Sequence, residues 1–158
     1  MWFRRERDPL EGALGHRFHD PGLLTLALAH RSGANEQGLP ENNERLEFLG
    51  DAVLGLIAAE WLFRRYPDRP EGDLARRKAQ LVSEGPLAEH ARALELGERV
   101  RLGVGEERSG GRDKASILAD TLEAVFGALW LDGGMEAARP AVERYLEAAD
   151  RGGAAGRS

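Results

Sequence analysis

The sequence contains no cysteine, only two lysines beside twenty arginines, and no long hydrophobic run. Without cysteine the chain has neither disulfide bonds nor thiolate metal ligands, which is typical of a cytoplasmic protein. The longest uninterrupted apolar run covers residues 52–59, whereas a membrane span needs roughly 18 residues. We therefore expect a cytoplasmic chain that makes no contact with membranes.

The remaining composition is that of an ordinary folded domain. The 158 residues are 42% hydrophobic and 31% charged, which indicates one globular domain, predicted for residues 1–150. The last eight residues, RGGAAGRS, show no pattern, and residues 151–158 are predicted to be a linker or disordered tail. The formal net charge of −5 argues against a uniformly basic nucleic-acid-binding surface. It does not exclude a basic patch, because acids gathered at a metal site would offset it.

Helical periodicity dominates the sequence and no alternating strand pattern is present, so the predicted fold class is all-α. Each predicted helix is an apolar repeat of helical spacing, bounded by proline, glycine or capping residues. The predicted helices cover residues 10–18, 21–31, 41–66, 71–85, 86–96, 115–131 and 136–149. Residues 33–40 and 97–114 are rich in glycine and polar residues and are predicted to be loops.

The longest predicted helix, residues 41–66, carries a row of acids although most of it is apolar. Glu44, Glu47 and Asp51 fall within roughly 60° of one another at about 100° per residue. The opposite side forms an apolar stripe of Leu46, Leu49, Val53 and Ile57. Beyond Asp51 the helix is apolar nearly all round, which predicts that it runs through the middle of the domain.

A second apolar helix, predicted for residues 115–131, shows the same anomaly. Asp120 and Glu123 are three residues apart and are therefore neighbours on one face, which Ser116 and Gly127 share. The other side carries Leu118, Leu122, Val125 and Leu129. A glycine on the acidic face permits another helix to approach closely.

If the two acidic faces meet, they form one cluster of four carboxylates: Glu47, Asp51, Asp120 and Glu123. Two unit charges about 4 Å apart repel by about 4 kcal/mol at an effective dielectric constant near 20. Such a cluster either takes up protons or binds a hard divalent cation, and all-oxygen ligands select Mg²⁺ or Mn²⁺. Carboxylate-held Mg²⁺ commonly activates water against a phosphodiester. Periodicity alone leaves the alternative open, which is a solvated acidic face without a ligand.

The runs that carry these acids resemble the motifs of one family. NNERLEFLGDAVL, residues 42–54, resembles the signature of the ribonuclease III family, and ILADTLEAVFGALWLDGG, residues 117–134, resembles its second acidic motif. Between them, EGDLARRKAQLV (71–82) and LGVGEERSGGR (102–112) match in order and spacing. The resemblance covers about residues 10–149, nearly the whole chain.

The resemblance implies a compact all-α endonuclease domain that forms a homodimer and cleaves double-stranded RNA, with Mg²⁺ or Mn²⁺ as cofactor. The implied products carry 5′-phosphate and 3′-hydroxyl ends, and the implied role is the processing of rRNA and mRNA. Glu47, Asp51, Asp120 and Glu123 match the catalytic acids and metal ligands of the family. Among them, Glu123 is implied to lie closest to the metal and the scissile phosphate.

Three further residues match family positions with secondary roles. Glu44 matches another acid of the signature, and Glu71 matches an acid near the RNA edge of the site. Phe48 matches the aromatic residue that inserts into the partner subunit. It flanks the acidic face away from the apolar stripe, where a ring is hard to bury within a monomer. A core position within its own subunit is the alternative.

Basic residues give a weaker indication of RNA contacts. Arg76, Arg77 and Lys78 are predicted to lie on the exposed side of their helix, where a phosphate contact and a merely solvated face are both compatible with the pattern. Lys114 is a further candidate, but Asp113 stands where the family often has a second basic residue. The run GVGEERSGG lacks a P-loop lysine and a preceding strand, so no nucleotide cofactor is expected.

Two other function classes compete with an endonuclease. A non-catalytic RNA-binding or ribosome-associated module would use the same fold, although all four acids are present here. A redox metalloprotein would need a Glu-x-x-His pattern, and none accompanies His16 and His19. These two histidines are predicted to be surface residues. His30 is predicted to be a structural histidine that forms hydrogen bonds. Family members usually carry a double-stranded-RNA-binding domain after the nuclease domain, and the Gly/Ala-rich tail is expected to begin a tether to one. A short form that works without that domain is the alternative.

Overall fold

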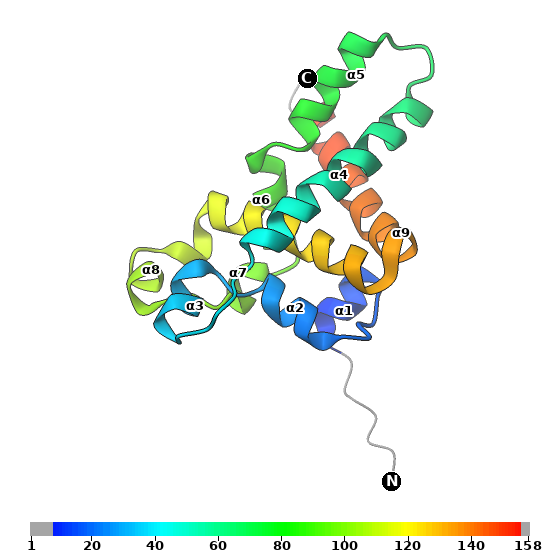
Figure 1. Cartoon of the computed structure of the whole chain (residues 1–158). Coiled ribbons are helices and arrows are strands. Elements are labelled where there is room, and N and C mark those ends of the chain that lie inside the picture. Colours follow the sequence, from blue (N-terminus) through cyan, green and yellow to red (C-terminus); the bar gives the residue numbers. More distant parts are fainter. Residues whose placement is uncertain (1–7, 156–158) are drawn as a thin grey trace.

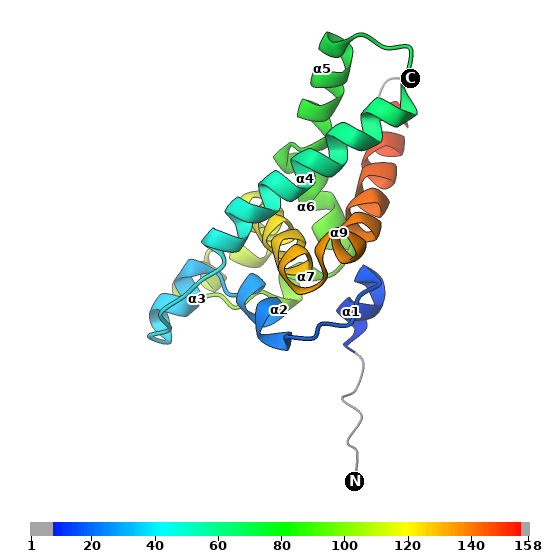
Figure 2. The same cartoon turned by 45° about the vertical axis from the view of Figure 1, so that its right-hand side comes forward.

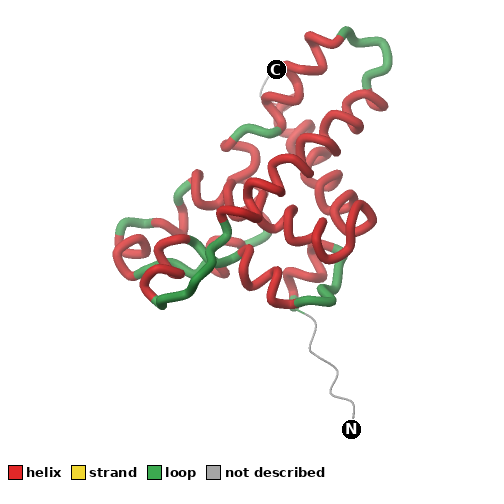
Figure 3. The backbone as a smooth tube through the Cα atoms, in the orientation of Figure 1, coloured by secondary structure: helices red, strands yellow, loops and turns green. Residues whose placement is uncertain are grey.

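The computed structural model describes residues 8–155, and these form an assembly of helices (Figure 1). The elements in chain order are α1 (Pro9–Leu14), α2 (Pro21–Ala27), α3 (Arg31–Glu36), α4 (Glu44–Arg65), α5 (Glu71–Leu81), α6 (Glu84–Ala93), α7 (Leu96–Arg99), α8 (Val104–Arg108), the 3-10 helix η1 (Gly111–Asp113) and α9 (Ala115–Ala155). Within residues 8–155 no strand is formed, and β-type pairing is limited to an isolated bridge between Ala29 and Arg101 (Figure 3). The predicted all-α class is confirmed, and no described helix is long and apolar enough to cross a membrane.

The core lies where α4 crosses the first half of α9 (Figure 2). The stripe predicted for α9 is buried throughout, with exposures of 0 to 1%: Leu118, Leu122, Val125 and Leu129. On α4, Leu46, Val53 and Ile57 are buried as predicted, while Leu49 is half-buried against the core. The two stripes therefore face each other, as amphipathic helices require.

One prediction about α4 is wrong, because the helix is not enclosed on all sides. Phe48, Leu56 and Phe63 are exposed by 82%, 57% and 72%. They lie within about 80° of one another on the helix, so they form one apolar face of α4 that no other described element covers. The apolar sequence after Asp51 thus serves two surfaces, the core and this open face.

The boundaries of several elements differ from their predictions for local reasons. The first helix ends at Leu14 rather than Phe18, because Gly15 adopts the left-handed conformation (φ 71°) that terminates helices. The second ends at Ala27 rather than Arg31, because Ala29 joins the bridge to Arg101.

Both predicted loops contain helices. Residues 33–40 begin with the end of α3, whose N-terminus is capped by His30: Nδ1 accepts a hydrogen bond from the Ser32 backbone N–H at 3.2 Å. Residues 97–114 hold α7, α8 and η1, and the backbone N–H of Val104 in α8 donates to Glu36 Oε2 at 2.7 Å. The contact at α8 comes from a residue 68 positions away, and histidine is not among the usual N-cap residues, so the local composition revealed neither.

The last helix is divided at Gly134, whose φ of 64° and ψ of −154° lie outside the helical region. The two predicted helices, 115–131 and 136–149, therefore exist as the two arms of α9. The second arm continues to Ala155, so its predicted end at Ala149 is wrong. Residues 156–158 of the predicted tail lie outside the described residues, and the linker role of 151–158 stays a prediction.

Just before this bend, the carboxylate of Asp132 holds the connection between α1 and α2. It accepts hydrogen bonds from His16 Nε2 at 2.6 Å and from the backbone N–H groups of His19 and Asp20 at 2.8 and 2.9 Å. His19 is exposed as predicted, but the surface prediction for His16 is wrong, since its side chain is 14% exposed. The sequence concealed this contact because 116 residues separate His16 from Asp132.

The crossing of α4 and α9 depends on two glycines. A Cβ atom at Gly50 would lie 1.6 Å from the backbone oxygen of Glu123. A Cβ atom at Gly127 would lie 2.4 Å from the backbone oxygen of Leu46 and 3.1 Å from the nitrogen of Gly50. No side chain fits at either position, so backbone meets backbone here. Gly127 was expected to allow close approach, whereas Gly50 was not identified from the sequence.

Replacing Gly50 with alanine is therefore expected to destabilise the domain strongly. Overpacking costs about 1–3 kcal/mol, and a methyl group against backbone belongs at the upper end, which corresponds to about 10 °C in melting temperature. Thermal unfolding followed by circular dichroism measures this. Gly72→Ala is the matched control, because nothing lies within 4 Å of a Cβ atom there. Equal melting temperatures for the two variants would contradict the close crossing.

Candidate active site

The crossing brings the four predicted acids together. Glu47 and Asp51 flank Gly50 on α4, and Asp120 and Glu123 lie on the facing side of α9. Their carboxyl groups meet in two hydrogen-bonded pairs, Glu47 with Asp120 and Glu123 with Asp51. Each pair joins one helix to the other, so the backbone approach at Gly50 fixes the spacing of both.

Burial and mutual repulsion change how these carboxyls ionise. Burial, followed by the charge and hydrogen bond of Asp120, raises the pKa of Glu47 to about 7. Burial, followed by the hydrogen bond and charge of Asp51, raises the pKa of Glu123 to about 8. Burial also raises the pKa of Asp120, against a lowering effect of its hydrogen bond with Glu47. The raised pKa values keep Glu47 and Glu123 partly protonated near neutral pH, so each can donate a hydrogen bond to the aspartate that it faces.

The donor set fits a hard divalent cation. It consists of carboxylate oxygens, the ligands that Mg²⁺ and Mn²⁺ prefer, and the two shared protons are those that a cation would replace. Among residues 8–155 no three or more histidine, aspartate or glutamate side chains are arranged to hold one metal ion as they stand. The pairs would have to open toward a common centre, with water completing the coordination, as is usual for Mg²⁺.

The two secondary acids lie in different places. Glu44, at the start of α4, lies on the rim of the cluster, where its charge contributes to the raised pKa of Glu47. Its carboxylate is 3.8 Å from Arg31 Nη1, and both side chains are exposed. Glu71 is the first residue of α5 and lies beyond the C-terminal end of α4 (Figure 1). The acids lie at the other end of α4, and the helix from Asp51 to its last residue, Arg65, is about 21 Å long. This protomer therefore does not bring Glu71 to the cluster.

Two of the predicted RNA contacts are engaged within the protein. Arg76 and Arg77 both pair with Asp73, at 3.4 and 3.2 Å. Arg77 is also only 20% exposed, so it is not on an open face of α5 as predicted. Lys78 is half-buried and forms no ion pair with any described residue.

The rim beside α3 and α8 holds Glu106 and His30, which the sequence did not connect with the site. Lys114, the other predicted RNA contact, pairs with Glu106 at 2.6 Å. His30 Nδ1 lies 2.8 Å from Ser32 Oγ, which in turn accepts a hydrogen bond from the Gly103 N–H at 2.9 Å. The prediction of a hydrogen-bonded structural histidine is confirmed, and burial lowers its pKa. The charges of Glu106 and Asp120 act on His30, so this network borders the acids.

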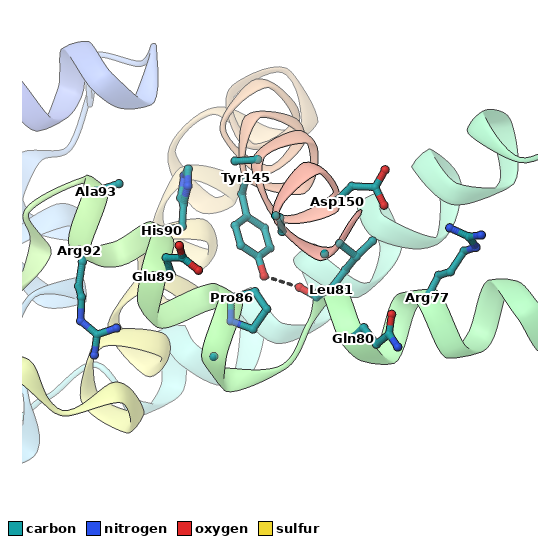
Figure 4. Close-up of a pocket in the computed structure, with 15 residues that line it drawn as sticks. Arg77, Gln80, Leu81, Pro86, Glu89, His90, Arg92, Ala93, Tyr145 and Asp150 are labelled. Carbon is teal, nitrogen blue, oxygen red and sulfur yellow. Dashed lines mark hydrogen bonds between the residues drawn. The ribbon is translucent and has the colours of Figure 1, made fainter. Parts of the chain in front are cut away.

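A groove of about 810 Å³ between α5, α6 and the end of α9 is separate from the acids (Figure 4). The hydroxyl of the buried Tyr145 donates to the backbone oxygen of Leu81 at its floor. His90 lies beside the tyrosine ring, with 5.3 Å between ring centroids, and burial lowers its pKa. None of the four acids lines this groove.

A second groove, of about 930 Å³, adjoins the open apolar face of α4. Its apolar lining comes from α2, α4 and the first arm of α9: Leu23, Leu26, Leu46, Leu49 and Leu131. Phe48 stands at its edge with a ring that is 82% exposed. The prediction that Phe48 is not part of its own core is confirmed.

Known proteins share this fold and these motifs. A family model described as Ribonuclease-III-like matches residues 20–149. Ribonuclease 3 of Streptomyces coelicolor is 56% identical over 138 residues, 87% of this chain and 50% of that protein. Ribonuclease 3 of Nitratidesulfovibrio vulgaris is 54% identical over 140 residues, 88% of this chain and 55% of that protein. The chain belongs to the ribonuclease III family.

The structural comparison identifies the part of the family that is present. The nuclease domain of ribonuclease III from Campylobacter jejuni superposes with a TM-score of 0.84 at 44% identity, covering 90% of this chain and 96% of that one. A second structure of that domain gives a TM-score of 0.81 at 45% identity, covering 87% and 91%. By contrast, the chain spans about half the length of the curated relatives it matches. It therefore corresponds to the nuclease domain of the family.

The acid pairs predict an unusual pH dependence of stability. Glu47 and Glu123 have pKa values raised above those of the unfolded chain, so the folded state binds more protons and loses stability as pH rises through about 7 to 8. Burial lowers the pKa of His30 and His90, which opposes this trend, but their ordinary value near 6.5 places most of that opposing contribution at lower pH. We expect the melting temperature in EDTA to fall between about pH 6.5 and 8.5.

Glu123→Gln should flatten this profile, because the amide donates a hydrogen bond to Asp51 at every pH. Differential scanning calorimetry of both proteins in EDTA measures the difference. Parallel profiles for wild type and variant would show that Glu123 does not titrate in this range.

Proposed function

We propose that this chain is the nuclease domain of a divalent-metal-dependent endoribonuclease that cleaves double-stranded RNA, leaving 5′-phosphate and 3′-hydroxyl ends. The observation that carries the proposal is the cluster of four carboxyls across the Gly50–Gly127 crossing, in a chain 56% identical to a ribonuclease 3. Processing of structured rRNA and mRNA precursors in the cytoplasm is the role that we infer for the whole protein.

Glu47, Asp51, Asp120 and Glu123 are the residues that would hold Mg²⁺ or Mn²⁺. When bound, such a cation supplies an activated water and neutralises charge at the scissile phosphate. The chain's own contribution begins with proton release, because Glu47 and Glu123 must lose their protons to act as ligands. Their raised pKa values place this loss between about pH 7 and 8, so activity should rise over that range.

A homodimer is supported by the open apolar face of α4. Phe48, Leu56 and Phe63 expose a face that is costly to leave in water, and the neighbouring groove is lined by leucines. We infer that Phe48 of one protomer enters this groove on the second, a self-complementary contact of the kind that twofold dimers use. The Campylobacter jejuni nuclease domain is described as having structural flexibility in a region involved in dimer formation. A dimer would also place two acid clusters along one RNA duplex, recognised by shape and 2′-hydroxyls.

A non-catalytic duplex-RNA-binding or ribosome-associated module is the second candidate. It would need the fold and cations that contact RNA, but not the acids. The retention of all four acids, with a donor set that fits a hard cation, favours the enzyme. Incubation with a long RNA duplex distinguishes the two.

Glu123→Gln should reduce cleavage of a long RNA duplex in Mg²⁺ by at least about 100-fold, since even outer-shell ligands commonly contribute 10- to 100-fold. Gel electrophoresis of the products under single-turnover conditions measures the rate. Glu98→Gln is the control, because Glu98 lies on α7 outside the cluster. If wild type and Glu123→Gln leave the duplex equally intact, the enzymatic proposal fails and the binding module is favoured.

Phe48→Glu should convert the dimer to monomer. Truncating an interface hot spot costs about 2 kcal/mol or more, about 30-fold in dissociation constant, and an unpaired carboxylate adds to this. Sedimentation velocity at several concentrations reports the mass. Val104→Glu is the matched control, because Val104 is 50% exposed on α8, away from this face. An unchanged mass for Phe48→Glu would reject the interface.

A further inference from the structure

Lys78 belongs to α5, and its side chain reaches across to the backbone of α4. A Cβ atom at Gly55 would lie 3.7 Å from Lys78 Nζ and 3.8 Å from its Cε, so the ammonium end reaches this point of α4. Gly55 follows Asp51 by four residues, which places both on one side of the helix, one turn apart. A positive charge therefore stands about one helical turn from the acid cluster.

This ammonium group is not used within the described part of the chain. It has no hydrogen-bond acceptor there and no carboxylate within 4.0 Å, although the side chain is half-buried. The neighbouring Arg76 and Arg77 share the carboxylate of Asp73. Asp51, the nearest acid along α4, is instead paired with Glu123. The three N–H donors of the Lys78 ammonium group therefore lie near the acid cluster without pairing with any of its carboxylates.

The charge balance of the site calls for such a cation. Four ionised carboxylates carry −4, and one divalent ion would leave −2, before the charge of a phosphodiester is added. Glu44 and Glu84 make the rim more negative, as their effects on the pKa values of Glu47 and Asp120 show. An RNA strand approaching this cluster is repelled unless a fixed positive charge faces it.

We propose that Lys78 binds a non-bridging oxygen of the phosphodiester that lies over the acids, and so holds the RNA strand at the site. This inference rests on the proposed function and assigns one cation to it, while Arg76, Arg77 and Lys114 remain engaged with acids of the protein. Lysine suits the role because its compact charge and three donors accept any direction of approach of a phosphate oxygen.

Lys78→Met tests the assignment, with Lys78→Arg as the conservative variant and Arg64→Met as the control. Arg64 is 76% exposed and pairs with Glu60, and nine residues separate it from Gly55, which places it on the opposite side of α4. We expect Lys78→Met to lower kcat/KM for a long RNA duplex by about 10- to 100-fold. Lys78→Arg should recover most of this loss, and Arg64→Met should cleave like wild type.

Salt dependence separates a phosphate contact from a structural role. In the Glu123→Gln background, which binds without cleaving, duplex affinity is measured by filter retention between about 50 and 200 mM salt. Loss of one phosphate contact should reduce the slope of log K against log salt by about 1 in Lys78→Met and leave it unchanged in Arg64→Met. Melting temperatures should be equal, since Lys78 has no partner to lose.

Each outcome decides the proposal. The proposal is overturned if Lys78→Met matches Arg64→Met both in its cleavage rate and in its salt slope. If Lys78→Met loses activity, has a lower melting temperature than wild type and keeps the wild-type salt slope, then Lys78 only holds α5 against α4. That result overturns the proposal as well. If wild type does not cleave, the proposed function fails, and the salt slopes still establish whether Lys78 contacts phosphate.

Discussion

Backbone contact between α4 and α9 is the constraint on which the rest of this structure depends. Helices with ordinary side chains at their contact pack 8–10 Å apart. Gly50 and Gly127 remove the side chains at the crossing, and the backbone oxygens of Glu123 and Leu46 occupy the space that Cβ atoms would need. The leucine and valine stripes then interdigitate on one side of this contact. On the other side, acids from both helices are forced within hydrogen-bonding distance.

That enforced proximity explains the electrostatics of the site. Isolated glutamates on a helix surface ionise normally, but here burial and a facing aspartate raise the pKa of Glu47 to about 7 and of Glu123 to about 8. The folding energy of the core maintains an arrangement that is unfavourable for its own charges. A divalent cation that replaced the shared protons would relieve this repulsion, so the contact that stabilises the fold would also prepare the site for the metal that we propose.

The helix α4 serves three surfaces with one sequence. Leu54 and Ile57 face the core, Glu47 and Asp51 face α9 across the acids, and Phe48, Leu56 and Phe63 face outward. A helix with apolar residues on two sides is stable only if both are covered, which links dimer formation to the same element that carries the acids. Movement of α4 at the dimer contact would therefore be transmitted directly to the carboxyl pairs.

The sequence by itself determined the helical class, both apolar stripes, the acidic faces and the family, because helical periodicity and contiguous motifs are local properties. Helix ends were less predictable: α3 and α8 depend on caps from His30 and on a contact from the distant Glu36, and α9 continues to Ala155 without an apolar pattern. Tertiary structure alone decided which acids pair, that Gly50 is the point of contact, that Asp132 buries His16, and which cations are already engaged. Those outcomes depend on groups brought together from distant parts of the chain, and periodicity along one helix contains no information about the charge that faces it.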